Sequence, residues 1–463
     1  MISSIDSVKL VISSRLKLSG LPNSLREELI KRFTLPNPKW IENERMGRWN
    51  RNTPPTLTFF RKSGKNGIVV PRGTIRQILL LLKQNDIRHT LEDKRRELPP
   101  VDIPFTGALK AFQVIATREM LKKEFGTLCG PTGSGKTVMA LHMISRRRQP
   151  TVVVVHTKDL AFQWMKRITD FLNIPENEIG LIGAGQKRIG DRITVAMVQS
   201  LYKCVEEVVP HCGYIVVDEC HRAPSRTFTE AISAFDARYM LGLSATPWRR
   251  DKLSKLIFWH LGDLHHEVNQ AGLVEKGHIL EAEIVVRETE FKPFHDPVGE
   301  HSQMLSELTA DDGRNRLIAS DVAGEVKRLE GVCLVLTDRK QHAETLNAIL
   351  RYKYHLSSDL LTGDLTMSRR REVVERLNRG EIEVLVATGQ LIGEGFDCSH
   401  LSTLFLATPI RFSGRVLQYL GRVLRPAPGK TRARVYDYVD VNVEVLTAAA
   451  RSRQSVYNRA PER

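Results

Sequence analysis

Short, continuously apolar segments alternate with amphipathic stretches along most of the chain. Apolar runs rich in β-branched residues are typical of parallel strands, because such strands are covered on both faces. Between residues 101 and 287 we expect five buried strands: Leu128–Cys129, Thr151–Val155, Thr194–Met197, Tyr214–Val217 and Met240–Leu243. This pattern predicts a doubly wound α/β domain.

The same pattern resumes after a polar stretch, residues 291–300, which contains two prolines and a glycine. Four further apolar runs are expected to be strands: Val332–Leu336, Val384–Ala387, Leu404–Ala407 and Val435–Val439. We therefore expect an α/β fold with two tandem domains built on parallel sheets. Their expected bounds are residues 99–287 and 288–463.

Residues 1–98 follow a different pattern, in which β-like and helix-like stretches are mixed. The β-like stretches are Ser7–Ile12, Thr56–Phe60 and Gly67–Val70, and the helix-like ones are Ser24–Phe33 and Thr74–Gln84. Two consecutive prolines, Pro99 and Pro100, favour a linker after them. We expect a small α+β domain at residues 1–98, and 463 residues are enough for three domains.

Several classes of protein are excluded by composition. The longest aliphatic runs, Ile78–Leu82 and Val152–Val155, are too short to span a bilayer. The N-terminus lacks the basic and then apolar order of a secretory signal, so we expect a cytoplasmic protein. The six cysteines form no CxxC pair, which argues against a zinc site, an iron–sulfur cluster and a disulfide framework.

Positive charge is concentrated near the N-terminus. Residues 1–100 hold 20 Lys and Arg against 9 Asp and Glu, so they carry +11 of the net +16. A basic surface of this size suggests a polyanionic partner.

A glycine-rich segment after the first expected strand matches the pattern GxxxxGK[ST]. Its residues are Gly130, Pro131, Thr132, Gly133, Ser134, Gly135, Lys136 and Thr137. Such a loop lets backbone N–H groups surround the β-phosphate of a nucleotide at a helix N-terminus. Lys136 would reach the β- and γ-phosphate oxygens, and the Thr137 hydroxyl would hold Mg²⁺. We expect a site for ATP with Mg²⁺.

An acidic pair, Asp218 and Glu219, follows the apolar run Tyr214–Val217. A strand end would place Asp218 beside the phosphate loop, where it completes the Mg²⁺ shell. Glu219 would then orient and deprotonate the attacking water. An Asp-Glu pair after a strand is more often a solvated turn, but the preceding phosphate loop favours a hydrolytic site.

A third element, residues 418–425, lies in the second α/β domain. Arg422 and Arg425 are three residues apart, so one helical face could direct both guanidinium groups at the γ-phosphate. With Gln418, these arginines predict an ATP site shared between two domains, which close on ATP and separate after its hydrolysis. Alone, a helix with two arginines is usually only a surface helix.

Together these motifs resemble superfamily 2 helicases, specifically the XPB/UvsW-like DNA helicases and branch-migration enzymes, over Phe105–Asp440. The resemblance implies two RecA-like domains. It implies that Gln113, after Phe112, reads adenine and that Asp397 senses the nucleotide. Residues matching the strand-contacting motifs, and implied to bind DNA, are Thr157, Lys158, Gln199, Thr337, Arg339, Gly363 and Thr388.

The sequence departs from the family at one motif. Trp248-Arg249-Arg250-Asp251 stands where XPB-type enzymes carry an Arg-Glu-Asp motif, so the strand-separating role of that motif is not transferred. Nor does the sequence contain a PD…(D/E)xK nuclease pattern, which counts against a complete restriction translocase.

Two clusters in residues 1–98 combine basic and aromatic residues. One consists of Lys62, Lys65, Arg72 and Arg76 around Phe59-Phe60, and the other of Lys39-Trp40, Arg45, Arg48-Trp49 and Arg51. Basic side chains neutralise phosphates and aromatic rings stack on unpaired bases, so we expect a module that recognises forked or branched DNA. The alternative is a solvated charged face around core aromatics.

The leading hypothesis is a DNA-dependent ATPase that moves 3′ to 5′ by resemblance and unwinds or branch-migrates DNA. Its expected partner is forked, branched or single-stranded DNA; RNA is a weaker candidate, and no membrane partner is expected. A second hypothesis is a duplex translocase, or the motor of a restriction or defence assembly, that does not separate strands. A third is an ATP-gated nucleic-acid clamp.

Overall fold

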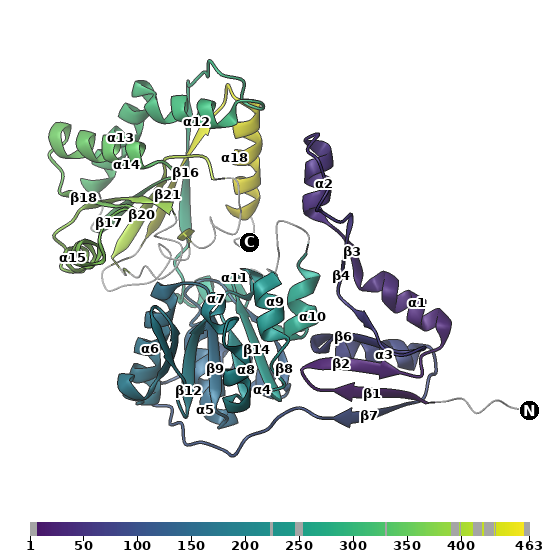
Figure 1. Ribbon diagram of the computed structural model, residues 1–463. Coiled ribbons are helices and arrows are strands. Elements are labelled where there is room, and N and C mark those ends of the chain that lie inside the picture. Colours follow the sequence, from purple (N-terminus) through teal and green to yellow (C-terminus); the bar gives the residue numbers. More distant parts are fainter. Residues whose placement is uncertain are drawn as a thin grey trace, which may run out of the picture. The chain divides into compact units, whose positions relative to one another are not determined.

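The computed structural model describes residues 7–222, 226–245, 253–328, 331–389, 398, 400–410, 419–420, 430 and 432–457. They form two compact units, one made of most of residues 7–268 and the other of most of residues 269–457 (Figure 1). Each unit contains a mainly parallel sheet, so the expected α/β class is confirmed.

The large sheet of the first unit has eight strands in the order β11-β10-β12-β9-β13-β14-β8-β15. In chain order they are β8 Phe125–Cys129, β9 Thr151–Val155, β10 Gly180–Gly183, β11 Gln186–Arg188, β12 Ile193–Met197, β13 Tyr214–Val217, β14 Tyr239–Ser244 and β15 Leu264–Glu267. All neighbours pair in parallel except β10 and β11. The five strands expected from the apolar runs are all present.

Helices cover both faces of this sheet. They are α4 Ala111–Leu121, α5 Lys136–Arg147, α6 Lys158–Leu172, α7 Val198–Leu201, α8 Val205–Val208, α9 Arg226–Ile232 and α10 Lys255–Leu261. Helices α7 to α10 share one core with alternate strand residues such as Val154 and Val217. The intervening residues, such as Val153, are equally buried and point to the opposite face, on which α4, α5 and α6 pack together.

The second unit contains six parallel strands in the order β16-β21-β20-β17-β19-β18. They are β16 Ala282–Thr289, β17 Val332–Thr337, β18 Ser358–Leu361, β19 Val384–Thr388, β20 Leu401–Leu406 and β21 Ala433–Asp440. Strand β16 pairs with β21 along its whole length, so this sheet begins at Ala282. The helices are α12 His301–Ala310, α13 Asp312–Val326, α14 Lys340–Ala348, α15 Met367–Asn378 and α18 Glu444–Tyr457, with α11 Gln270–Glu275 before the sheet.

A buried ion pair fixes α18 to β21. Arg453 on α18 donates to Asp437 on β21 at 2.7 Å, and the two side chains are 2% and 3% exposed. The Tyr457 hydroxyl donates to the same carboxylate at 2.9 Å. The C-terminal helix is therefore held by charge as well as by apolar packing.

Replacing Arg453 by Met is expected to lower the free energy of unfolding by about 3–5 kcal/mol, because it leaves the Asp437 carboxylate buried without its cation. Chemical denaturation measures this change. A matched control is Arg316→Ala, which breaks an ion pair with Asp312 whose side chains are 67% and 85% exposed. That control should cost less than about 1 kcal/mol. Equal effects of the two substitutions would contradict the structural role of the buried pair.

Residues 7–93 form a small α+β module, as expected. Its five-stranded sheet has the order β5-β6-β2-β1-β7. The elements are β1 Val8–Ile12, β2 Arg15–Ser19, α1 Asn23–Arg32, β5 Arg61–Lys62, β6 Ile68–Pro71, α3 Ile75–Gln84 and β7 His89–Asp93. Strand β1 alternates buried Val8, Leu10 and Ile12 with more exposed residues, which places one face of the sheet on the module's core.

The module shares its core with the first α/β sheet. Trp259 of α10 lies edge-on to the rings of Phe33 and Phe59, with ring centroids 4.9 and 5.6 Å apart. Leu253 and Leu256 belong to the same buried cluster. A chain shortened to begin at residue 99 would expose this apolar surface, so point substitutions are the better test of what the module binds.

Arg72 corrects one expectation. It belongs to the first basic–aromatic cluster, yet its side chain is buried and donates to the Ala237 carbonyl at 2.6 Å. Burial lowers its pKa to about 10, which leaves it charged at neutral pH. Arg76 pairs with Asp263 at 3.0 Å. Both arginines attach the module to the first α/β domain. The guanidinium of Arg72 is buried and therefore needs protein acceptors.

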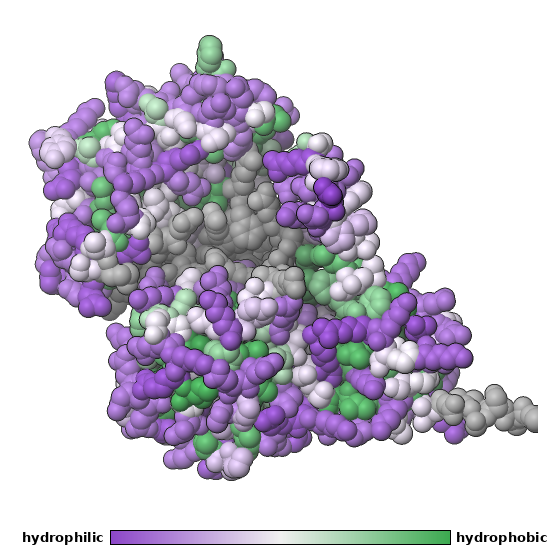
Figure 2. All heavy atoms as spheres, viewed as in Figure 1, coloured by the Kyte–Doolittle hydropathy of each residue, from purple (hydrophilic) through white to green (hydrophobic). Residues whose placement is uncertain are grey.

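An arm extends from the module (Figure 1). Its stem is the antiparallel pair β3 Thr34–Pro36 and β4 Thr56–Thr58, and between them lie α2 Pro38–Arg45 and a loop. Figure 2 shows that the visible surface of both units is mainly hydrophilic, with small separate hydrophobic areas. Among the described helices, none combines the length and the apolar composition that crossing a membrane requires. All six cysteines are buried, and none forms a disulfide.

Candidate active site

The predicted chemistry gathers at the carboxyl edge of the first α/β sheet. Strands β9, β13, β14 and β8 are neighbours in that order and run parallel. They end directly before His156, Asp218, Ala245 and Gly130 respectively. Residues distant in sequence therefore meet along one edge, where ligands of doubly wound sheets bind.

Two glycines shape the phosphate loop. Gly133 and Gly135 have φ angles of 90° and 78°, a region that side chains disfavour. A Cβ atom on Gly135 would also lie 2.4 Å from Nε2 of Gln113. The Gly130 N–H donates to the Ser244 carbonyl at 3.0 Å, which ties the start of the loop to β14. Glycine is therefore required at 135 for both backbone and steric reasons.

The loop leads directly into α5, whose first residues are Lys136 and Thr137. The Lys136 ammonium donates to the Gly130 carbonyl at 2.8 Å, so it lies across the loop. The unpaired N–H groups of a helix N-terminus and this ammonium attract anions together. The chemistry of these donors fits the phosphates of a nucleotide.

The Asp218 carboxylate is buried and held in place. One oxygen accepts from the Trp164 indole N–H at 2.8 Å, and the other accepts from the Glu219 N–H at 2.9 Å. The Asp218 N–H donates to the Val154 carbonyl at 3.0 Å. Burial, and then the neighbouring Glu219 carboxylate, raise the pKa of Asp218 above its ordinary value. A cation at this position would therefore be favourable, which fits a site for Mg²⁺.

Glu219 adopts an uncommon backbone conformation. Its φ of 48° lies in the left-handed region, which costs a residue other than glycine roughly 1–2 kcal/mol. The turn places its Oε2 3.2 Å from Nδ1 of His221. That same nitrogen lies 3.2 Å from the Ser244 hydroxyl, at the end of β14. Side chains from two neighbouring strand ends are thereby joined beside the phosphate loop.

Gln113 lies in the first turn of α4, and its side chain is buried. Its Oε1 accepts from the Lys110 N–H at 2.9 Å, and its Nε2 faces Gly135. The structure therefore brings Gln113, the phosphate loop and the acidic pair together, although they lie in three separate parts of the sequence.

Comparisons with known proteins point to one family. The family model "Type III restriction enzyme, res subunit" matches residues 106–249, and "Helicase conserved C-terminal domain" matches residues 317–427. DNA 3′-5′ translocase XPB2 of Sulfurisphaera tokodaii is 27% identical, over 75% of this chain and 87% of its own length. This chain is a superfamily 2 helicase of the XPB/UvsW-like group.

Two further similarities bear on this helicase. The putative ATP-dependent RNA helicase L396 of Acanthamoeba polyphaga mimivirus is 24% identical, over 78% of this chain and 70% of its own length. A fragment of a putative HsdR subunit of a type I restriction enzyme from Vibrio vulnificus YJ016 has a TM-score of 0.57 and 18% identity. That match covers 76% of this chain and 66% of the fragment, and it supports the shared fold.

In this helicase, three predicted nucleic-acid contacts lie at neighbouring strand ends of the first unit. Thr157 and Lys158 follow β9, and Gln199 follows β12. The Thr157 hydroxyl accepts from the Leu160 N–H at 3.3 Å and thus caps α6. Lys158 and Gln199 are exposed. The two exposed side chains are available to a ligand along this edge.

The predicted contacts of the second unit lie at or just after the carboxyl ends of β17, β18 and β19, which are also neighbours. Gly363 is exposed, and Thr388 is half-buried. Arg339 donates to the Ser302 hydroxyl at 3.2 Å. Thr337 is 1% exposed, and its hydroxyl lies 2.9 Å from Nδ1 of His342. The Thr337 hydroxyl therefore already has a protein partner. Its contact with a ligand remains a prediction.

Four predicted site residues lie outside the described residues: Asp397, Gln418, Arg422 and Arg425. The departure from the family motif at residues 248–251 also lies outside them. Their roles remain predictions from the sequence.

Sequence reasoning placed Trp164 beside the residues that resemble a strand-contacting motif and assigned it no role in hydrolysis. Its spacing from Leu160 and Ile168 on α6 predicts a core residue, and it is 1% exposed. Only the structure shows that its indole N–H points at Asp218. The available signal was weak, because a buried tryptophan normally finds an acceptor but the sequence does not say which one.

Trp164→Phe is expected to lower kcat for ATP hydrolysis roughly 10- to 150-fold, because a hydrogen bond to a charged group contributes about 1.5–3 kcal/mol. If Asp218 helps to hold Mg²⁺, the Mg²⁺ concentration for half-maximal activity should rise as well. A merely structural role would leave that concentration unchanged. Steady-state ATPase assays across a Mg²⁺ titration, with thermal unfolding as a folding control, measure both effects.

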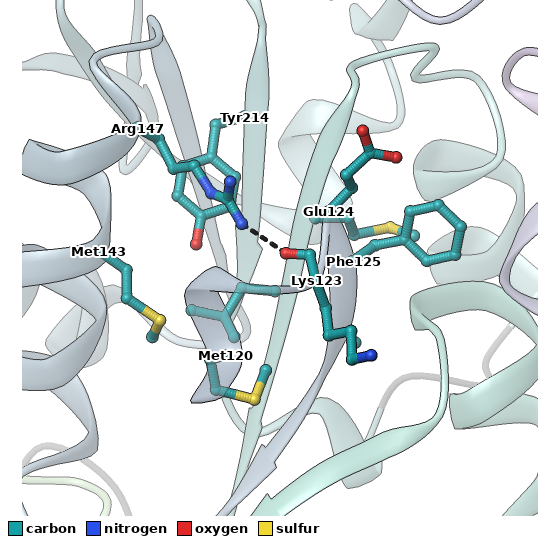
Figure 3. A pocket seen from close by; sticks show the side chains of 10 residues that line it. Met120, Lys123, Glu124, Phe125, Met143, Arg147 and Tyr214 are labelled. Carbon is teal, nitrogen blue, oxygen red and sulfur yellow. Dashed lines mark hydrogen bonds between the residues drawn. The ribbon is translucent and has the colours of Figure 1, made fainter. Parts of the chain in front are cut away.

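A small pocket elsewhere in the first unit is not part of this site (Figure 3). It lies at the amino ends of β8, β13 and β14, opposite the edge that carries the phosphate loop. Arg147 projects into it, donates to the Lys123 carbonyl and lies 4.3 Å from the Tyr239 ring centroid. Its guanidinium already has protein partners.

Proposed function

We propose that this helicase hydrolyses ATP to move along DNA in the 3′ to 5′ direction and to unwind or branch-migrate forked and branched DNA. The observation that carries the proposal is the grouping of Lys136, Asp218 and Glu219 at one sheet edge. The relative XPB2, named a DNA 3′-5′ translocase, supports the track and the direction.

In the proposed site, the N–H groups of residues 130–137 and the Lys136 ammonium bind the phosphates of ATP, and Gln113 contacts the adenine. Thr137 and Asp218 would hold Mg²⁺, which when bound neutralises charge on the phosphate oxygens. Glu219 orients the attacking water and accepts its proton. Its fixed turn and its contact with His221 hold the carboxylate in one orientation.

The second unit is proposed to complete the site. Arg422 and Arg425 would approach the γ-phosphate as fingers supplied by the same chain, and Gln418 and Asp397 would sense the nucleotide. An ATP site completed by two units closes them when ATP binds and releases them after hydrolysis, which converts chemistry into steps along a strand. The strand ends that carry Lys158, Gln199 and Gly363 are the proposed DNA contacts.

The charge distribution favours a substrate with a branch. Residues 1–100 carry a net charge of +11, and some of their cations form internal ion pairs. Arg76, Arg95 and Arg96 pair with acidic residues in this way. Exposed cations nevertheless remain on β5 and on the arm. Because the module shares a core with the motor, DNA bound to it would be held at a fixed position on the first unit.

Steady-state ATPase assays with single-stranded DNA, forked DNA and RNA test the proposal. We expect stimulation by DNA, larger for a fork than for blunt duplex of equal length. Stimulation by RNA alone would favour the activity named for the relative L396. Stimulation by neither polymer would contradict the proposal.

A second candidate is a translocase that moves on duplex DNA without separating its strands. The match of residues 106–249 to a restriction-enzyme subunit model favours it. Displacement of a third strand from a triplex, without displacement of a strand from a fork, would identify this activity.

A further inference from the structure

The loop after α2, at the end of the arm, exposes a tryptophan. Trp49 is 82% exposed, although a tryptophan side chain normally buries most of its surface. Ile41 and Met46, on and beside α2, are 51% and 53% exposed. A large apolar ring kept in water on a projecting element is unfavourable for the isolated chain, which suggests that a ligand covers it.

The protein holds this loop in a defined shape. The Asn50 side chain accepts from the Asn43 amide at 2.8 Å, and it donates to Glu44 at 2.9 Å and to the Trp40 carbonyl at 3.3 Å. The Arg48 N–H donates to the Asn43 carbonyl at 2.8 Å. The residues on both sides of Trp49 are thereby tied to α2. These hydrogen bonds hold the turn in a shape that leaves the Trp49 ring exposed to solvent.

The junction between the β3–β4 stem and α2 is fixed in a similar way. The buried Asn37 side chain accepts from the Lys39 N–H at 3.1 Å and donates to the Pro54 carbonyl at 2.8 Å. Pro36, Pro38 and Pro55 restrict the backbone where the two sides of the arm meet. These contacts fix α2, and with it the Trp49 loop, relative to the β3–β4 stem, which lowers the entropy cost of binding there.

The arm that carries Trp49 also carries exposed cations. Lys39, Arg45, Arg48 and Arg51 are all exposed, and within the part of the chain that the structure describes none of them forms an ion pair. The Arg51 guanidinium lies 5.6 Å from the Trp49 ring centroid. Helix α2 also carries two glutamates, and one of them, Glu44, accepts a hydrogen bond from the Asn50 side chain. Four exposed cations on the same arm as an exposed aromatic ring match a phosphate backbone that carries an accessible base.

We propose that the end of the arm binds the branch point of a DNA substrate, where Trp49 stacks on an unpaired base and the exposed arginines of the arm bind the flanking phosphates. This inference rests on the proposed function and specifies which DNA structure the module recognises. The base must be unpaired, because both faces of a base inside a duplex are already covered by its neighbours. The interaction is independent of sequence, since every base has a face that can stack.

The test is equilibrium binding of the full-length protein to a forked duplex with unpaired bases at its branch and to a blunt duplex of the same sequence. Stacking on one base contributes about 1–3 kcal/mol, so Trp49→Ala should weaken binding to the fork roughly 5- to 150-fold. Binding to the blunt duplex should change little. Trp49→Phe, which keeps an aromatic ring, should retain most of the affinity.

Two more variants sharpen the test. Tyr352→Ala, which removes an aromatic ring 78% exposed on the second unit, is the matched control and should bind both DNAs as wild type does. Asn50→Ala keeps the ring but releases its loop, so it should weaken fork binding and reduce the fluorescence change of 2-aminopurine placed at the branch. If Asn50→Ala acted only through folding, it would weaken binding to the fork and to the blunt duplex equally.

Equal fork affinity for wild type and Trp49→Ala would overturn the inference. An equal loss on fork and blunt duplex would overturn it too, because the contact would not require an unpaired base. These outcomes differ from failure of the proposed function, in which DNA does not stimulate the ATPase of the wild-type protein at all.

Discussion

Replacing Lys136 by Ala is expected to reduce ATP hydrolysis by at least about a thousandfold. The Lys136 ammonium lies across the phosphate loop, 2.8 Å from the Gly130 carbonyl oxygen. From there it can reach the β- and γ-phosphate oxygens of a bound nucleotide. Removal of one preorganised charge at a phosphoryl group typically costs two to three orders of magnitude in rate, and Lys136 is also needed to bind the nucleotide. Steady-state ATPase assays at saturating DNA measure the loss.

The matched control for this substitution is Lys122→Ala. Lys122 is exposed in the same unit and pairs with Glu119 rather than with the phosphate loop. Its removal should leave hydrolysis unchanged, and both variants should unfold at about the wild-type temperature. Hydrolysis by Lys136→Ala at a rate near that of wild type would place the nucleotide site elsewhere.

Replacing Glu219 by Gln is expected to reduce hydrolysis by about two to four orders of magnitude while ATP still binds. Glutamine has the size of glutamate and can keep the contact with His221, but it cannot accept a proton from water. Binding of a fluorescent ATP analogue, measured beside single-turnover hydrolysis, separates the two effects. An exposed carboxylate, Glu207, which pairs with Lys187, provides the control Glu207→Gln.

The same substitution distinguishes a motor from an ATP-gated clamp. A clamp needs ATP binding and not its hydrolysis, so Glu219→Gln would hold DNA and preserve the clamp's function. A motor with this change would bind DNA and ATP and stop moving. If Glu219→Gln hydrolyses ATP within about tenfold of wild type, the role assigned to this carboxylate is wrong.

The sheets were the most predictable part of the fold. Val152–Val155 and the other apolar runs are strands because a strand covered on both faces is apolar at every position, and few other short segments are. Parallel strands of one sheet end at the same edge. Because the phosphate loop and the pair Asp218 and Glu219 each follow a predicted strand directly, the sequence was enough to predict that they lie at that edge. Local pattern and simple topology therefore carried this part of the prediction.

The role of individual charged residues was less predictable. Arg72 was grouped with Lys62 and Lys65 in one basic–aromatic cluster, yet it is buried and donates to the Ala237 carbonyl of the first α/β domain, whereas the lysines are exposed. An arginine that binds a phosphate and one that binds a carbonyl across a domain contact have the same signature in a sequence. Only the tertiary structure separates the first basic–aromatic cluster from the second.

Details of the hydrolytic site also depend on tertiary contacts. The sequence placed Asp218 after a strand but could not show that Trp164 donates to it, because the two residues come from different elements. Nor could it show the left-handed φ of Glu219, a conformation that residue type does not favour. Such strain survives where the surrounding structure imposes it, which is common at functional sites.

The proposed function requires that ATP hydrolysis at this site separates DNA strands. The most direct measurement is strand displacement from a forked duplex, with ATP and Mg²⁺, by the wild-type protein and by Glu219→Gln. We expect displacement by wild type when the fork has a 3′ single-stranded tail, little displacement with only a 5′ tail, and none by the variant. Displacement of equal extent by Glu219→Gln, or DNA-stimulated hydrolysis by wild type with no displacement on any fork, would contradict the proposed function.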